Sequence, residues 1–439
     1  MRGILAESYV FSTPRPSRHM RRTLLFLALT TLSASSMSAQ ATDKDLARAK
    51  KILASTPLID GHNDLAWVIR EDTVAPMDVG AYDLRKRTRG HTDLDRLKQG
   101  MIGGQFWSIY VPGEARDSGY ARIQLEQFDI ARRFIEMYPE RLAPAFSAKD
   151  VRDAFKRGRI GSLLGMEGGH AIENSLGALR SYYALGARYM TLTHNVTLDW
   201  ADAALDSARH GGLTEFGKEV VREMNRLGML VDLSHVSPAT MSDALDVTEA
   251  PVIFSHSDAR ALVDVPRNVP DSILKRLDRN GGVVMVTFVP SFISQQFANH
   301  EHDFSEFQRE ARRRLGSGDR DAVRKETDAW RIAHPAPVVS LAEVANHIEH
   351  IRKVAGVDHV GIGGDFDGIS ATISGLNDVS TYPALFAELV HRGWSDGDLK
   401  KLAGENVLRA MSKAEEVAAR LQKSRAPSTK TIAQLDGKK

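Results

Sequence analysis

Apolar and polar positions repeat along this chain with two different periods, and the two periods alternate from residue 42 onward. Short runs of apolar and β-branched residues are typical of buried strands. Eight such runs predict strands at residues 57–62, 103–110, 160–166, 187–193, 228–234, 251–256, 282–289 and 358–364. Between most of these runs, apolar residues recur every three or four positions, which indicates amphipathic helices. Such helices are predicted at 120–138, 174–185, 214–227, 238–247, 270–280 and 340–355.

Eight strands that alternate with helices predict an α/β fold, namely a (β/α)8 barrel over residues 42–420. A doubly wound open sheet is the alternative architecture. Residues 295–337 are charged and helix-prone and lack a strand pattern, so we expect a helical insertion there that serves as a lid or an interface. Residues 421–439 are polar and contain a proline, and we expect them to form a loose C-terminal tail.

Residues 1–41 are predicted to be a secretory signal peptide, on the pattern of residues 20–41. Arg21 and Arg22 form a positive segment, an apolar stretch begins at Leu24, and residues 39–41 form an A-x-A cleavage site. Residues 1–19 lack this pattern, which makes Met20 a second candidate start. We therefore expect an exported protein, in a bacterial periplasm or secreted, with no stable membrane anchor after cleavage. An uncleaved anchor is the alternative, and the paired arginines weakly resemble a twin-arginine signal.

Charge and cysteine content narrow the classes of function. The formal net charge of the 439 residues is +2, but without residues 1–41 there are 53 basic and 55 acidic side chains. No basic patch argues for nucleic-acid binding. The chain has no cysteine, which excludes disulfides, thiolate metal ligands and a cysteine nucleophile. Any metal ion must therefore be held by histidines and carboxylates.

Histidines and carboxylates gather at the predicted strand ends. His62 and Asp64 close the first strand, and residues i and i+2 of a strand share a face, so both side chains converge on one point. Taken singly, each such residue is explained by a capping or hydrogen-bonding role. In a barrel, however, the C-terminal strand ends meet at one face. Five other strand ends also carry such residues, in the segments 165–170, 192–195, 232–235, 254–257 and 363–368.

The number of potential ligands indicates a two-metal site. Two neighbouring metal ions usually share one carboxylate and need more protein ligands than a single ion does. Five potential ligands are available, and Asp365 is left over as a base; the five are His62, Asp64, Glu167, His235 and His256.

Seven segments together resemble the membrane (renal) dipeptidase family, zinc enzymes of the amidohydrolase superfamily. The resemblance runs in family order from about residue 57 to 410. The segments are IDGHND (59–64), GQFWS (104–108), EGGH (167–170), LTHN (192–195), VDLSH (231–235), RNVPD (267–271) and GDFDG (364–368).

The resemblance implies a role for each site residue. One zinc ion would be held by His62, Asp64 and Glu167, and a second by Glu167, His235 and His256, with a hydroxide also bridging the two. Asp365 would be the acid/base and would also contact the substrate. His194 would contact the scissile carbonyl, and Arg267 would bind the terminal carboxylate of a dipeptide substrate.

Some features depart from the family or leave other functions open. Without cysteine, the disulfide-linked dimer of animal relatives cannot form, which leaves a homodimer without a disulfide. No C-terminal hydrophobic tail follows, so a lipid anchor like theirs is not expected. The insertion at 295–337 has no counterpart and bears on substrate range. Other hydrolases of the superfamily, acting on small amides, β-lactams or lactones, and a non-catalytic binding protein are the alternatives.

Overall fold

The computed structural model describes residues 41–316 and 320–437. Except for its last residue, the signal peptide predicted at residues 1–41 lies outside the described residues. Among the helices of the described segments, none is long and apolar enough to cross a membrane.

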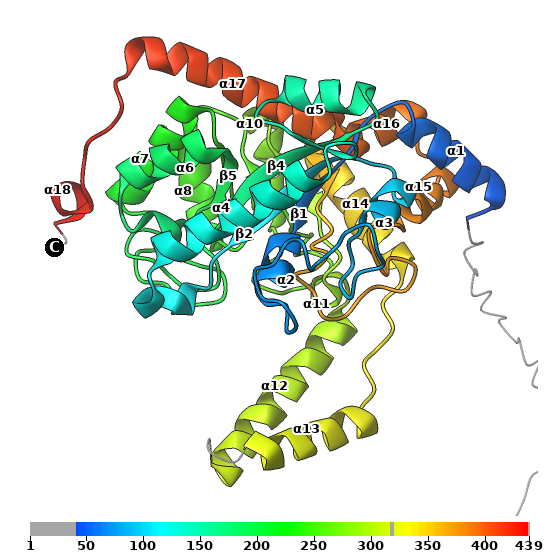
Figure 1. Ribbon diagram of the computed structural model, residues 1–439. Coiled ribbons are helices and arrows are strands. Elements are labelled where there is room, and N and C mark those ends of the chain that lie inside the picture. Colours follow the sequence, from blue (N-terminus) through cyan, green and yellow to red (C-terminus); the bar gives the residue numbers. More distant parts are fainter. Residues whose placement is uncertain (1–40, 317–319, 438–439) are drawn as a thin grey trace, which may run out of the picture. The chain divides into compact units, whose positions relative to one another are not determined.

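Eight parallel strands close into a barrel (Figure 1), which confirms the predicted (β/α)8 architecture and excludes the open sheet. Going round the barrel, β1 pairs with β2, β2 with β4, each later strand with the next, and β9 returns to β1. The barrel strands are β1 (Leu58–Asn63), β2 (Ile102–Tyr110), β4 (Ile160–Glu167), β5 (Ala187–Thr191), β6 (Leu230–Asp232), β7 (Ile253–Phe254), β8 (Val283–Val286) and β9 (Val360–Ile362).

The barrel differs from the prediction in two respects. A short additional strand, β3 (Leu142–Pro144), pairs with the first half of β4 and was not predicted. In addition, the strands from β5 to β9 are all shorter than the apolar runs that predicted them. Beyond β6 and β7, the side chain of Asp232 takes the place of the backbone hydrogen bonds between the strands. It accepts hydrogen bonds from the backbone N–H groups of Ser234 and Ser255.

Helices surround the barrel (Figure 1), and all six predicted helical segments are helical, with 270–280 divided into α9 and α10. The α-helices are α1 (Asp43–Leu53), α2 (Leu65–Arg70), α3 (Leu94–Gln99), α4 (Tyr120–Met137), α5 (Ala148–Lys156), α6 (Leu176–Leu185), α7 (Glu215–Leu227), α8 (Pro238–Val247), α9 (Asp271–Leu274), α10 (Leu277–Asn280), α11 (Pro290–Ile293), α12 (Gln295–Leu315), α13 (Arg320–Ala333), α14 (Leu341–Ala355), α15 (Tyr382–His391), α16 (Asp396–Lys400), α17 (Asn406–Ser424) and α18 (Ile432–Asp436). The tighter or wider turns are η1 (Gly113–Ser118), η2 (Gly169–Ile172), η3 (Val357–His359) and the π-helical η4 (Lys401–Glu405).

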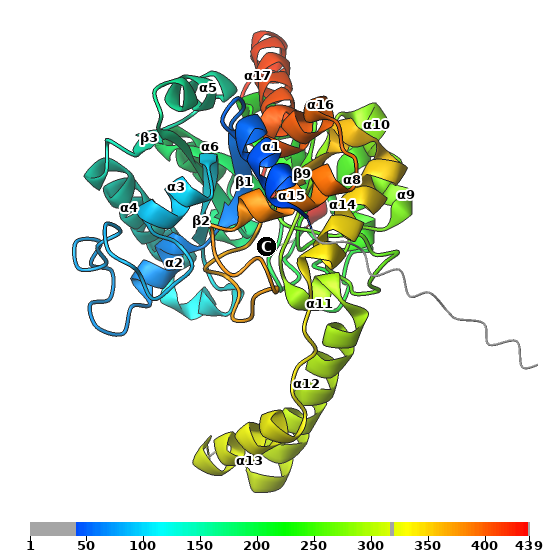
Figure 2. The same cartoon turned by 90° about the vertical axis from the view of Figure 1, so that its right-hand side faces the viewer.

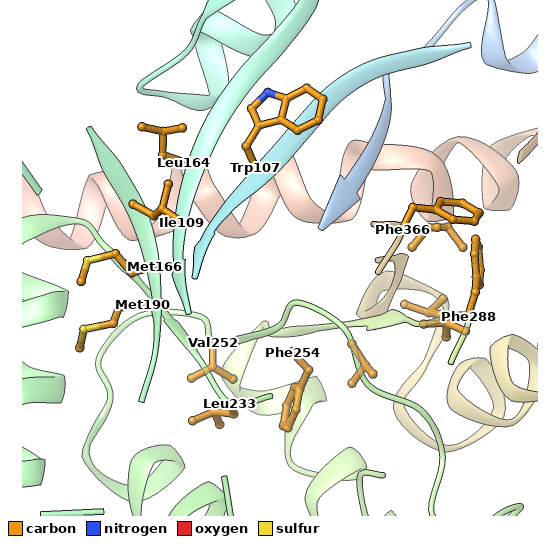
Figure 3. Close-up of a cluster of buried hydrophobic side chains, with 14 of the residues drawn as sticks. Trp107, Ile109, Leu164, Met166, Met190, Leu233, Val252, Phe254, Phe288 and Phe366 are labelled. Carbon is orange, nitrogen blue, oxygen red and sulfur yellow. The ribbon is translucent and has the colours of Figure 1, made fainter. Parts of the chain in front are cut away.

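The strands separate two layers of apolar side chains, because successive residues of a strand point to opposite faces. On β4, Leu164 and Met166 join the large core between strands and helices, part of which is drawn in Figure 3. Leu163 instead joins a second cluster with Phe106 and Tyr189. Burying one such side chain contributes about 1.5–3 kcal/mol, so both layers stabilise the strand ends that carry the site.

Gly165 allows Tyr189 to lie against β4. A Cβ atom at Gly165 would lie 2.0 Å from the Cζ atom of Tyr189, so any larger residue would displace the aromatic ring. The buried Tyr189 reaches up from β5 to the last residues of β1, where its hydroxyl lies 2.8 Å from Nδ1 of His62.

The segment 295–337 forms a helical hairpin of α12 and α13, which extends away from the barrel in both Figure 1 and Figure 2. Trp330 of α13 holds the two helices together, since its ring lies 5.3 Å from that of Phe304 and 6.0 Å from that of Phe307. The base of the hairpin is anchored in the core by Phe297, which is 8% exposed.

Residues 421–439 are predicted to form a loose tail. For the described part of this segment the prediction is wrong, because it docks on α7. Ser428 donates a hydrogen bond from its hydroxyl to Glu219 at 2.7 Å. Farther on, a carboxylate oxygen of Asp436 accepts the backbone N–H of Phe216. These contacts are polar and specific, so a hydrophobic pattern does not reveal them.

Candidate active site

The five predicted metal ligands meet at the C-terminal ends of the barrel strands, with Glu167 at their centre. Nε2 of His62 lies 3.3 Å from Oε2 of Glu167, and Nε2 of His235 lies 3.1 Å from Oε1. Nε2 of His256 is 3.5 Å from that same Oε1 atom. Asp64 completes the group, since its Oδ2 lies 3.3 Å from Nε2 of His62. One carboxylate therefore faces three imidazoles.

The opposite nitrogen of each of these three imidazoles has its own partner. Nδ1 of His62 pairs with the Tyr189 hydroxyl at 2.8 Å. Nδ1 of His235 donates to the side-chain carbonyl of Asn195 at 3.0 Å. Such partners fix the ring orientation and the tautomer, so that the Nε2 lone pairs face the centre.

A hydrogen-bond chain supports His256 from below. Nδ1 of His256 lies 2.8 Å from the hydroxyl of Ser255, and that hydroxyl donates to Asp232 at 2.6 Å. Asp232 also receives the hydroxyl of Thr191 at 2.5 Å. The buried carboxylate of Asp232 therefore orients His256 through one intervening hydroxyl.

The electrostatics of the cluster suit a cation. Burial lowers the pKa of His235 and of His256 well below the usual value, which keeps both imidazoles neutral. Burial alone would raise the pKa of Glu167, yet the charge of His62 and the contact with His235 hold it well below its usual range. Burial opposes a proton on His62, but Tyr189, Glu167 and Asp64 raise the pKa of His62 well above its usual value. Glu167 is therefore an ionised carboxylate beside one cationic and two neutral imidazoles, and a bound metal ion would replace the proton on His62.

The residues present fit a metal ion. The fully buried Nε2 atom of His62 has no hydrogen-bond partner among the described residues, although two carboxylates lie 3.3 Å away. Ligand atoms around one tetrahedral zinc ion are separated by about 3.3 Å. The donor set of imidazoles and carboxylates is the one that zinc takes when thiolates are absent.

Three overlapping groups of side chains come close enough to hold metal ions. In each, the ligand atoms lie within 4.8 Å of one another; the groups are His62–Glu167–His256, Glu167–His194–His235 and His62–Asp64–Asp365. Glu167 belongs to two groups, as expected for a shared carboxylate. The grouping also places His194, predicted to contact substrate, near Glu167, with Nε2 at 3.8 Å from Oε1.

Asp365 lies on the loop that follows β9, directly beside the cluster. Its φ of 61° is left-handed, an uncommon conformation for a residue with a side chain. Its backbone N–H donates to the carbonyl of His62, which ties this loop to the end of β1. A Cβ atom at Gly368 would lie 2.3 Å from Oδ2 of Asp64 and 2.5 Å from Oδ1 of Asp365, so only glycine leaves room for both carboxylates.

Burial raises the pKa of Asp365 well above its usual value, and the neighbouring carboxylates of Asp64 and Glu167 raise it further. A carboxyl group with a raised pKa binds a proton more readily than an ordinary aspartate, which suits a group that accepts and releases a proton in acid/base catalysis.

Arg267 reaches the same pocket from the loop after β7. It is 1% exposed, and its Nε and Nη1 atoms have no hydrogen-bond partner in the described structure. The guanidinium packs on the ring of Phe292 at 5.3 Å, and burial lowers the pKa of Arg267 to about 10. A buried cation with free donors is suited to an anionic group of a ligand.

The predicted site residues other than His62 line one pocket of about 470 Å³ that opens at the strand ends. Aromatic and apolar side chains, among them Trp67, Tyr110, Leu205 and Ile369, form much of the remaining wall. A neighbouring hollow of about 510 Å³, lined by Tyr120, His170 and Arg209, contains none of the predicted site residues. The pocket at the strand ends is therefore the candidate active site.

The sequence did not reveal the supporting residues. Tyr189 occupies the middle of an apolar run and has the pattern of a core aromatic residue. Asn195, Asp232 and Ser255 belong to segments singled out at strand ends, but nothing in the spacing assigns them to particular histidines. These residues lie close in sequence to the metal ligands, but this proximity identifies them as supporting residues only once the structure is known.

Comparison with known proteins gives the same picture. The sequence model described as membrane dipeptidase (Peptidase family M19) matches residues 46–425. A protein named dipeptidase verJ, from Clonostachys rogersoniana, is 42% identical over 393 residues, which covers 87% of this chain and 90% of that protein.

Solved structures share the fold. The probable dipeptidase PvdM from Pseudomonas aeruginosa has a TM-score of 0.73 and 25% identity, over 85% of this chain and 99% of that one. A metallo peptidase from Rhodobacter sphaeroides, liganded with a phosphinate mimic of the dipeptide L-Ala-D-Ala, has a TM-score of 0.66. It is 24% identical over 82% of this chain and 99% of its own, a likeness that supports the fold.

Proposed function

Because the chain belongs to the membrane dipeptidase family, peptidase family M19, and is a metal-dependent dipeptidase, we propose that it hydrolyses dipeptides with a free C-terminal carboxylate at a two-zinc centre. The observation that carries this proposal is the convergence of three imidazole Nε2 atoms on Glu167, beside a buried arginine with free donors. The dipeptide mimic bound by the Rhodobacter sphaeroides protein supports the substrate class.

The ligands divide into two sets that share one carboxylate. His62, Asp64 and Glu167 would hold one zinc ion, and Glu167, His235 and His256 the other. Zinc bound there would supply a water molecule acidic enough to attack at neutral pH, and would polarise the peptide carbonyl.

Asp365 moves the proton. Its carboxylate accepts the proton that the attacking water gives up and then delivers it to the nitrogen of the leaving amine. The tie between its backbone and the carbonyl of His62 keeps it beside the ligands during this transfer. His194, whose ring lies 4.8 Å from that of Tyr110, donates a hydrogen bond to the oxygen on which negative charge develops.

Arg267 sets the length of the substrate. Its guanidinium, which has free donors at Nε and Nη1, holds the terminal carboxylate through charge-assisted hydrogen bonds, and the peptide bond nearest that terminus then lies over the metal ligands. An enzyme that requires the carboxylate at this distance cleaves dipeptides and not internal bonds of longer chains.

The test combines metal analysis with a substrate panel. Purified protein reconstituted with zinc should contain close to two ions per chain and should hydrolyse dipeptides far better than their C-terminal amides. Full activity with one ion per chain would refute the two-metal centre, and equal rates on acid and amide would refute the carboxylate requirement.

A further inference from the structure

One side of the pocket is contributed by the helical insertion, through the first two turns of α12. Phe297 and Glu301 are four residues apart and therefore lie on the same face of the helix. Phe297 packs into the barrel core, so this face of α12 is turned toward the barrel. Glu301, one turn farther out, lines the candidate active site together with Pro290, Ser291 and Phe292.

Side chains that neighbour Phe297 and Glu301 on α12 make the contacts with α13. His300 pairs through Nε2 with the carbonyl of His334 at 2.8 Å, and Phe304 packs on Trp330. The side chains that hold the hairpin together are therefore distinct from the one that reaches the pocket. The side chain of Glu301 has no hydrogen bond or ion pair within the described parts of the chain.

The charge of Glu301 is unusual in its surroundings. Among the described residues that line the pocket, it is the only charged side chain that is exposed. The other carboxylates belong to the metal cluster or its immediate neighbours, and Arg267 is buried. The pocket mouth thus offers one accessible negative charge without a partner.

The position of Arg267 indicates which end of the substrate lies near Glu301. The guanidinium of Arg267 lies over Phe292, and Phe292 precedes Glu301 by nine residues on the wall that α11 and α12 form together. If Arg267 holds the terminal carboxylate, the side chain of the C-terminal residue lies against this wall.

We propose that Glu301 selects dipeptides whose C-terminal residue has a cationic side chain, lysine or arginine. Their methylene groups pack against apolar lining residues such as Leu205, while the charged end reaches the pocket mouth. This inference rests on the proposed function, because it uses the position of the carboxylate at Arg267.

The experiment compares Ala-Lys with Ala-norleucine, which has the same carbon chain but no amine, in the stereochemical series that the wild-type enzyme hydrolyses. The ratio of their kcat/KM values is measured for the zinc-loaded wild type, for Glu301→Gln and for Asp303→Asn. Asp303 is an exposed acid on the same helix that does not line the pocket, so its variant is the matched control. Lys-Ala and norleucine-Ala report on the other substrate position.

We expect the wild type to prefer Ala-Lys by roughly two- to fivefold, the range of an exposed ion pair. Glu301→Gln should remove this preference and Asp303→Asn should keep it, while 0.5 M salt should weaken it in the wild type. An unchanged ratio in Glu301→Gln, an equal fall in Asp303→Asn, no preference in the wild type, or an effect confined to Lys-Ala would overturn the inference. In this experiment, the result that contradicts the proposed function itself is distinct: the wild type would then hydrolyse none of these dipeptides.

Discussion

The metal-ligand cluster forms the floor of the pocket, and Arg267 and Glu301 belong to its outer wall. Polar side chains in these two regions differ in whether they already have partners. On the floor, the Nδ1 atoms of His62, His235 and His256 all have partners, so each ring is oriented before a ligand arrives. On the wall, Arg267 keeps two guanidinium nitrogens without partners, and Glu301 has no ion pair. Metal ligands need fixed geometry, whereas groups that recognise a substrate must keep their hydrogen-bonding capacity free for it.

Removing the shared carboxylate of the floor should have the largest effect. Glu167→Ala deletes the atoms that face all three histidines, so zinc content should fall toward zero. The loss of kcat/KM should exceed the roughly 10²–10⁴-fold that one acid/base group contributes. Metal analysis and dipeptide assays check this, with Glu173→Ala, which lies outside the ligand cluster, as the control. Retention of both zinc ions would show that Glu167 is not the shared ligand.

Asp365→Asn should keep the floor intact and stop the proton transfer. An amide of the same size cannot take up the proton, so kcat should fall by roughly 10²–10⁴-fold while zinc content remains that of the wild type. Single-turnover rates and metal analysis on the same preparation separate the two effects. Near-normal kcat with full metal content would mean that another residue moves the proton.

Tyr189→Phe tests whether the hydrogen bond between Tyr189 and His62 contributes to metal binding. The variant leaves Nδ1 of His62 without its partner, and loss of such a partner typically lowers metal affinity by about 10–100-fold. Competition with a chelator measures this affinity. Tyr182→Phe also loses one buried hydroxyl, which donates to the Ala171 carbonyl outside the site, and should bind zinc like the wild type. If both variants bind zinc equally well, Tyr189 does not hold His62 in place.

Changing the wall should have the smallest effect and should alter selectivity. Arg267→Met should reduce kcat/KM on a dipeptide by roughly tenfold or more, the value of a charge-assisted contact, with little effect on its C-terminal amide. Arg267→Lys keeps the charge but not the paired geometry and should give an intermediate result. An acid-to-amide ratio that is the same in all three enzymes would show that Arg267 does not bind the carboxylate.

The same contrast explains what the sequence could predict. The barrel and the positions of the metal cluster follow from local patterns, because strand ends such as His62 and Glu167 meet at one face of the fold. The support from Tyr189 depends on which core residue crosses to β1, and the docking of Ser428 depends on isolated polar contacts. Neither has a periodic signal, and the same holds for β3, a strand of three residues.

The filled barrel interior has a kinetic consequence. Tyr189 packs against Gly165 beneath the metal ligands, and the ligands face the pocket, so substrate and products share its mouth. If Arg267 binds the terminal carboxylate as proposed, the released C-terminal amino acid keeps that contact with the buried guanidinium, whereas the other product has lost its connection to that residue. Free amino acids would then compete with the next dipeptide for the same pocket, and we expect turnover to slow as product accumulates.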